Sequence, residues 1–266
     1  MNGLVILLFL FFIGSFVGWG IELLFRKWFG AHNPEHRWIN PGFLTGPYLP
    51  LYGFGLITLY SLASIPVKGL DFAHTGGQIG TKLIMFAFMA GAMTVLEYIA
   101  GVIFIKWMHV QLWDYSKEWG NLQGIICPRF SFFWALLGAA YYFLVHPYIL
   151  NSLNWLSRNL TFCLVIGFFY GVFAIDVTYS FQLVSKIRKF AIEKNIIVKY
   201  EELKSDIRRA SDEKKEKIRF MFAFRPEVPL REHLERYIEV IQAFAIPEHL
   251  TKHNRGKEHK NSKNKK

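Results

Sequence analysis

The chain has 266 residues, a formal net charge of +11 and 26 phenylalanines, and 52% of its residues are apolar. A soluble domain of this length needs fewer large apolar side chains, and here they come in long uninterrupted blocks. Composition therefore excludes an ordinary soluble globular protein. It predicts an all-α fold, a polytopic bundle of transmembrane helices.

Five blocks approach the roughly 20 apolar residues that a helix needs to cross ~30 Å of hydrocarbon. They are residues 4–25, about 46–65, 83–105, about 130–145, and 160 to about 184. The first lacks a basic flank and a cleavage site, so we expect a retained anchor and not a signal peptide. The fourth is closed early by His146 and Pro147, and extending it back through Ile125 and Ile126 would lengthen it. Six spans or a re-entrant segment is the alternative to five.

The basic residues of the loops predict the orientation in the membrane, since Lys and Arg favour the cytoplasmic side of short loops. Three basic residues follow the first block, two the second, three the third and one the fourth. Residues 182–266 then carry 22 Lys and Arg against 13 Asp and Glu, a net charge of +9. We therefore expect the N-terminus outside and the C-terminus inside.

The tail holds most of the positive charge without a recognisable nucleic-acid-binding module, which favours anionic inner-leaflet lipids over nucleic acid as partners. Residues 181–222 are expected to form one charged helix continuing the fifth span, and residues 230–244 a second, amphipathic helix. The predicted organisation is a membrane domain (1–184), a cytoplasmic basic helical extension (185–250) and a disordered basic tail (251–266). The extension is either a solvated hairpin or a docking arm for a soluble partner.

Three acidic residues lie inside the blocks: Glu22, Glu97 and Asp176. An ionised carboxylate in hydrocarbon costs at least a few kcal/mol, so each should face the bundle interior, water or a positive partner. Glu97 and Asp176 lie at similar depth, ~14 and ~15 Å of helix from the inner basic flanks. Each acid either fixes helix packing, paired with Arg26, Arg129 or a loop amide, or lines a polar pathway. Both interpretations stay open for Glu97 and Asp176, and the first is favoured for Glu22. Asp176 shares its helix face with Phe169, Phe173 and Ser180.

Two predicted inner loops have unusual composition. Residues 40–55 contain three prolines and four glycines, which excludes a continuous helix and predicts a broken or late-starting second span. Residues 112–129 carry Trp and Tyr side chains suited to the headgroup layer. Ten residues of these two loops are candidates for the cytoplasmic mouth of a polar path: Asn40, Gly42, Gly46, Pro47, Tyr48, Tyr52, Trp113, Asp114, Tyr115 and Arg129.

Other motifs do not support a catalytic or cofactor site. The glycines and lysine of residues 76–82 do not have the spacing of a phosphate-binding loop. His32 and His36 flank a proline, which argues against a metal site on a regular helix. Cys127 and Cys163 define no disulfide framework. We therefore predict no cofactor and no metal, and no catalytic constellation is recognisable.

Several motifs occur together in one order: residues 14–22 (GSFVGWGIE), residues 40–55, Glu97-Tyr98 followed by Gly101, residues 113–116 (WDYS), and residues 124–128 (GIICP). This sequence of motifs, over about residues 5–180, resembles the bacterial membrane-protein family called putative ABC-transporter type IV (CmpB-like). The resemblance implies a bacterial cytoplasmic membrane protein with a permease role, and it assigns neither substrate nor catalytic residue. Because the chain has no phosphate-binding loop, the ATPase subunit would be a separate polypeptide.

Three functional hypotheses follow. The leading one is a permease-type component of a transport system, in which Glu97 and Asp176 line a polar path and the two loops form its mouth or coupling surface. An alternative is an inner-leaflet enzyme acting on a lipid-linked substrate through Tyr48, Asp114 and Arg129. A third is a membrane scaffold or sensor that recruits a soluble partner through its basic tail. Deletion of residues 186–266 should abolish the function of such a scaffold. A homo-oligomer is compatible with each.

Overall fold

The computed structural model describes residues 2–30, 33, 35–64, 77–213, 234–235 and 238. This part of the chain is almost entirely helical, and its strands are two residues each, so the predicted all-α fold is confirmed. The chain forms two compact units, one that includes Met1–Glu202 and one that begins at Leu203. In the second unit Leu203, Ile207 and Leu234 are buried. The domain boundary expected at residue 184 stays a prediction.

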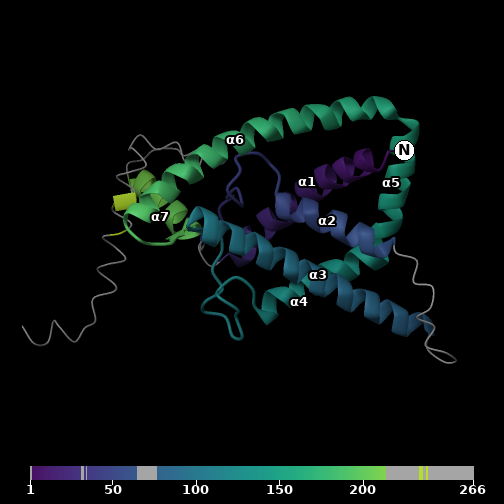
Figure 1. The fold of residues 1–266 in the computed structure, drawn as a ribbon, viewed down its shortest axis with the longest axis horizontal. Helices are drawn as coiled ribbons and strands as arrows, with labels where there is room; N and C mark the ends of the chain where they lie inside the picture. The colour runs from purple at the N-terminus through teal and green to yellow at the C-terminus, as the bar shows by residue number, and fades with distance from the viewer. Residues whose placement is uncertain are drawn as a thin grey trace, which may run out of the picture. The chain divides into compact units, whose positions relative to one another are not determined.

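Four helices of the first unit pack pairwise in chain order, α1 on α2, α2 on α3 and α3 on α4 (Figure 1). The elements are α1 (Gly3–Phe29), α2 (Pro50–Ala63), α3 (Gly77–Met108), β1 (Val110–Gln111), α4 (Pro128–Ala140), the π-helical turn η1 (Tyr141–Val145), α5 (His146–Arg158), the 3₁₀ turn η2 (Leu160–Phe162), α6 (Cys163–Glu193), β2 (Val198–Lys199) and α7 (Tyr200–Glu213).

Four helical segments of the described chain are long and apolar enough to cross a membrane: Gly3–Phe29, Leu83–Met108, Pro128–Arg158 and Leu160–Glu193. The second predicted span, about residues 46–65, corresponds to α2, whose 14 residues extend only ~21 Å. It begins at Pro50 because a proline at the first helical position lacks only an N–H that would be unpaired there. The predicted late start of the second span is therefore observed, and α2 is shorter than the hydrocarbon is thick.

The fourth span differs from the expectation at both of its ends. Ile125 and Ile126 do not extend it, because they lie in a loop closed by a bridge between Leu122 and Ile126, and α4 starts at Pro128. His146 and Pro147 do not end it either. The chain passes through the π-helical turn η1 and continues as α5, which turns away from α4 (Figure 1). Proline and π turns are the usual causes of sharp helix bends, and here they redirect the helix.

Glycines allow α1 and α2 to approach closely. A Cβ added at Gly18 would overlap the Tyr52 ring, and one at Gly14 would lie 2.8 Å from the Tyr52 carbonyl oxygen. Helices in lipid gain little from burying apolar surface, so close packing at small residues must hold them together.

We expect Gly18→Ala to lower the free energy of unfolding by about 1–3 kcal/mol, because it overpacks this contact. Gly20→Ala is the matched control, since a Cβ at Gly20 meets no atom within 4 Å. That variant should be neutral or more stable by up to about 1 kcal/mol. Unfolding in detergent micelles measures both, and equal stability of the two variants would contradict the close packing.

The core lies where α1, α2, α3, α4 and α5 meet. Leu10, Met89 and Leu156 are each fully buried there. By contrast α6 exposes a row of large apolar side chains along most of its length, as expected for a lipid-facing helix, and most of its buried residues lie in its C-terminal half. Phe11 and Phe12 of α1 contact Phe173 and Phe169 of α6 edge to face, which accounts for part of the high phenylalanine content.

The predicted continuous helix over residues 181–222 is wrong. The helix α6 ends at Glu193, Asn195 adopts φ = 52°, and the Ile196 N–H donates to the Ala191 carbonyl. The chain then forms β2, which pairs in parallel with β1, Val198 opposite Val110. This pairing joins segments that are far apart in the sequence, so no local pattern could predict it. The predicted second helix over 230–244 and the disordered tail over 251–266 lie almost wholly outside the described residues.

Candidate functional site

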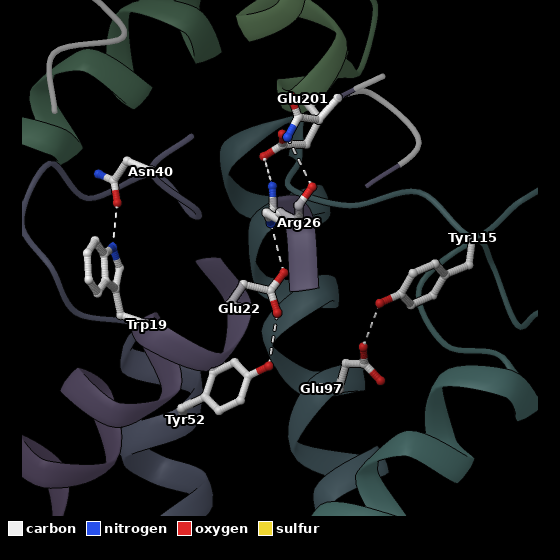
Figure 2. A network of polar contacts seen from close by, with 9 residues as sticks. Trp19, Glu22, Arg26, Asn40, Tyr52, Glu97, Tyr115 and Glu201 are labelled. Atoms are coloured by element: carbon white, nitrogen blue, oxygen red, sulfur yellow. Dashed lines mark hydrogen bonds and ion pairs between the residues drawn. The ribbon is translucent and has the colours of Figure 1, made fainter. Parts of the chain in front are cut away.

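The loop before α2 is held in shape by Asn40. Its side-chain amide donates to the carbonyls of Leu44 and Thr45, both at 3.0 Å, and its oxygen accepts from the Trp19 indole of α1 at 2.6 Å (Figure 2). The loop returns to α1 at Leu49, whose N–H donates to the Ser15 carbonyl. These bonds satisfy three backbone groups of the irregular loop within the protein, as hydrocarbon would require of any part of the loop that lies at membrane depth.

The prolines and glycines of this loop have specific positions. Gly42 has φ = +74°, in the left-handed region that favours glycine, and a Cβ there would crowd Leu49. A Cβ at Gly46 would overlap the Tyr48 ring, and Pro47 between them restricts the backbone that brings this ring over Gly46. These three predicted residues therefore shape the loop.

Asp176 of α6 is the acceptor that ties the loop to the bundle. Its carboxylate accepts from the N–H of Thr45 at 3.1 Å, the Thr45 hydroxyl at 2.7 Å and the N–H of Gly46 at 2.8 Å. The Tyr48 hydroxyl donates at 2.6 Å and the Ser180 hydroxyl at 3.0 Å. Five donors satisfy this buried charge without a cation. The sequence left open whether each acid pairs with a loop amide or lines a polar pathway. Asp176 pairs with the loop amides of Thr45 and Gly46.

A second polar centre lies at the end of α1. The Arg26 guanidinium contacts Glu22 Oε1 through Nε at 2.8 Å and Glu201 Oε1 through Nη1 at 2.6 Å. The Tyr52 hydroxyl of α2 donates to Glu22 Oε2 at 2.9 Å. Figure 2 shows Arg26 between the two carboxylates, with Tyr52 below Glu22. Three elements, α1, α2 and the start of α7, are therefore joined by one largely buried arginine.

Glu97 of α3 is 3% exposed and has far fewer partners. The Tyr115 hydroxyl donates to Glu97 Oε1 at 3.1 Å, as Figure 2 shows, while Oε2 has no hydrogen-bond partner among the described residues. The Trp134 indole is also placed to donate a hydrogen bond to this carboxyl group, and the Glu22 carboxylate interacts with it electrostatically. Burial raises the pKa of Tyr115 well above its usual range, and the carboxylates of Glu97 and Glu22 raise it further, so this phenol stays a donor.

The loop between α3 and α4 is held by a hydrogen bond within the loop and by an ion pair with β2. The Trp113 indole donates to the Ile125 carbonyl at 2.8 Å, and Asp114 contacts Lys199 Nζ at 2.8 Å. Arg129 pairs with Glu118 at 3.0 Å on the surface. The three residues of the enzyme hypothesis therefore contact three different partners: Tyr48 contacts Asp176, Asp114 contacts Lys199, and Arg129 contacts Glu118.

The Asp114–Lys199 pair gives a pH prediction. Burial alone would raise the pKa of Asp114, but hydrogen bonds from Lys199 and Ser116 hold it below its ordinary 3.8. The hydrogen bond to Asp114 raises the pKa of Lys199 above its ordinary 10.5. A lowered carboxyl pKa stabilises the fold above the unfolded value, and a raised lysine pKa stabilises it below the unfolded value.

We therefore expect the stability difference between the wild type and Asp114→Asn to be constant from about pH 5 to 9. It should shrink as the pH falls below 3.8 and as it rises above 10.5. Both side chains are partly exposed, so the difference should not exceed about 1 kcal/mol. Tryptophan fluorescence during unfolding measures it, and Glu118→Gln, which removes a surface pair elsewhere, provides the control. A difference independent of pH would contradict the assignment.

Several residues of these centres could not be selected from the sequence. Thr45 and Ser180 are ordinary polar residues until the loop meets α6. Lys199 and Glu201 lie among many tail charges that resemble a solvated helix, and only their long-range contacts distinguish them. Arg26 was considered as a partner for an acid, and it does pair with Glu22. Among the described residues, no cluster of three His, Cys, Asp or Glu side chains could hold a metal ion.

Long apolar helices and carboxylates held in the bundle interior define a multi-pass α-helical membrane protein. Residues 9–181 match the model of the family described as Putative ABC-transporter type IV, and the chain belongs to this family. The match runs from residue 9 in α1 to residue 181 in α6, and includes both loops and all three acids. It supports a role related to membrane transport. Neither a curated protein nor a solved structure matches the chain.

Proposed function

We propose that this chain is the membrane-spanning, permease-type component of a transport system that works with a separate ATPase subunit in the bacterial cytoplasmic membrane. The family and the four long apolar helices support the membrane and transport parts of this proposal. The substrate class is open. A homo-oligomer and contacts with anionic inner-leaflet lipids stay predictions.

The observation that carries the proposal is the incomplete pairing of Glu97. This carboxyl lies inside the membrane-crossing part of α3, is 3% exposed, and has an oxygen without a hydrogen-bond partner among the described residues. An ionisable group at this depth is costly, and a purely structural role would favour full pairing. Asp176, with five donors, is such a fully paired group. We therefore assign the polar path to Glu97, and the support of the loop to Asp176.

The two loops provide the mouth or coupling surface. The loop of residues 40–49 contacts Asp176 of α6. The loop of residues 109–127 contacts Lys199, in the chain that follows α6. Both loops therefore lie at the same end of the bundle as the start of the basic tail. A topology reporter fused after Glu213 tests the prediction that this end faces the cytoplasm.

Co-purification from native membranes tests the proposal. An ATPase should be recovered with the chain, and its hydrolysis rate in the reconstituted complex should fall about tenfold or more in Glu97→Gln, as for a residue acting directly on transport. Glu118→Gln, a change in an exposed surface pair, should leave the rate unchanged. Recovery of no ATPase, together with unaltered solute accumulation after gene deletion, would reject the proposal.

The scaffold hypothesis needs a different truncation from the one that the sequence suggested. Removing residues 186–266 would also remove Lys199 and Glu201, which contact the membrane domain. Truncation after Glu213 keeps both residues. A transport component should retain its ATPase-coupled activity in that variant, whereas a scaffold acting through the distal tail should lose its function.

A further inference from the structure

The segment from Val198 to Glu201, which follows α6 in the chain, packs against the end of the bundle that carries the two loops. We call these four residues the closure segment. Val198 pairs with Val110 of β1, and its N–H donates to the His109 carbonyl at 3.0 Å. Lys199 contacts Asp114 at 2.8 Å, and Glu201 contacts Arg26 at 2.6 Å. The segment thus makes backbone and ionic contacts with the end of α1 and with the chain that follows α3.

Burial along the segment shows that it is inserted and does not lie on the surface. Val198 is fully buried and Tyr200 is 2% exposed, whereas Ile197 just before them is 48% exposed. Burial, with the Glu201 carboxylate beside it, raises the pKa of Tyr200, and the ring also interacts electrostatically with Arg26 and Asp176. Tyr200 is therefore within electrostatic range of both polar centres, which are otherwise built on different helices.

The ionic contacts of the closure segment lie next to the residues that contact Glu97 and Glu22. Tyr115, the hydrogen-bond donor to Glu97, directly follows Asp114, which Lys199 holds. Glu22 shares Arg26 with Glu201. The Lys199 contact is thus one residue away from the donor to Glu97, and the Glu201 contact shares its arginine with Glu22.

We propose that the closure segment is a conformational gate, and that it opens this end of the membrane domain when the Arg26–Glu201 and Asp114–Lys199 contacts break. The functional role of this gate rests on the proposed transport function. Because the segment runs directly into α7, movement of the C-terminal extension moves the gate. The contacts suit reversible opening, since one ion pair is partly exposed and the pairing strand is only two residues long.

Cysteine accessibility tests the gate. The native cysteines are replaced (Cys127→Ala, Cys163→Ala), and Val184→Cys reports on the buried C-terminal part of α6, where Val184 is 1% exposed. A membrane-impermeant maleimide is applied to membrane vesicles that expose the loop end. We expect Glu201→Gln to increase the labelling rate about tenfold, because a largely buried ion pair loses one partner.

Glu202→Gln is the matched control, because this residue lies just outside the segment, its side chain is 40% exposed, and its carboxylate is 3.6 Å from the partly exposed Lys199 ammonium. It should change the rate by less than about twofold, as expected for a surface pair. Equal labelling of the Glu201 and Glu202 variants would overturn the proposal.

A cross-link tests docking in a chain that keeps all its ionic contacts. Val110 and Val198 lie opposite each other on strands ~4.8 Å apart, within the range of a disulfide. Val110→Cys with Val198→Cys should cross-link rapidly on oxidation, and more slowly once Glu201→Gln is added. Val110→Cys with Ile197→Cys is the control, because Ile197 precedes the strand and is 48% exposed, whereas Val198 is buried. Failure of the in-register pair to cross-link would overturn the gate.

Neither measurement uses a substrate or an ATPase. A chain that co-purifies with an ATPase but shows no difference between the Glu201 and Glu202 variants would retain the proposed function and lose the gate. A chain that shows the difference without an ATPase would retain the gate as a structural device and lose the transport proposal.

Discussion

Asp176→Ala lowers the free energy of unfolding by at least about 3 kcal/mol, because a hydrogen bond to a charged acceptor contributes about 1.5–3 kcal/mol and several are lost together. The N–H groups of Thr45 and Gly46 and the hydroxyl of Tyr48 are left without their acceptor. Unfolding by SDS in mixed micelles measures the loss.

Two comparisons sharpen this prediction. Asp176→Asn preserves the shape of the side chain but presents an amide N–H₂ to donors, so it should fall between the wild type and the alanine variant. Glu118→Ala removes an exposed carboxylate paired with Arg129, and should cost no more than about 1 kcal/mol. If Asp176→Ala were as stable as Glu118→Ala, the loop would not depend on this carboxylate. Faster proteolysis within residues 40–49 should accompany the loss of stability.

The second large effect is expected at Arg26. Removing its guanidinium leaves Glu22 and Glu201 facing each other without the shared positive charge. Breaking a fully buried pair costs about 3–5 kcal/mol. Because 22% of the Arg26 side chain remains exposed, we expect about 2–3 kcal/mol for Arg26→Met. Arg26→Lys should recover only part of this, since an ammonium cannot match the planar fork that contacts both carboxylates.

Arg129→Met is the matched control, because Arg129 is 64% exposed and forms its ion pair with Glu118 at the surface. It should change stability by no more than about 1 kcal/mol. In a double-mutant cycle, Arg26→Met combined with Glu201→Gln should destabilise less than the two single changes added together. Additive losses would show that the two side chains do not interact.

The three acids show how far sequence reasoning could go. Their cost in hydrocarbon identified Glu22, Glu97 and Asp176 as residues that needed a partner, and the structure supplies each with at least one. The sequence did not indicate which partner each would take. Asp176 is satisfied by a loop 130 residues earlier in the chain, whereas Glu97 accepts a hydrogen bond from a tyrosine beyond the end of its own helix. The two carboxylates thus take their hydrogen bonds from different loops.

At the start of the tail, by contrast, the local sequence pattern predicted the wrong secondary structure. Residues 194–201 carry charges that suit a solvated helix, and the local pattern therefore predicted one helix through this region. The buried contacts of Val198 and Tyr200 replace that preference with a strand and a turn. Propensity is a weak determinant once a segment can bury apolar surface against the rest of the protein.

By itself the sequence determined the membrane class, the positions of the long apolar helices, the irregular loop before α2 and the acids that required partners. Each of these follows from local properties, namely apolar length, proline and glycine content, and the cost of charge in hydrocarbon. Only the tertiary structure decided that Asp176 supports the loop, that Arg26 joins α1 to the tail, and that Glu97 keeps an oxygen without a partner among the described residues. These outcomes depend on contacts between distant segments, which local patterns do not encode.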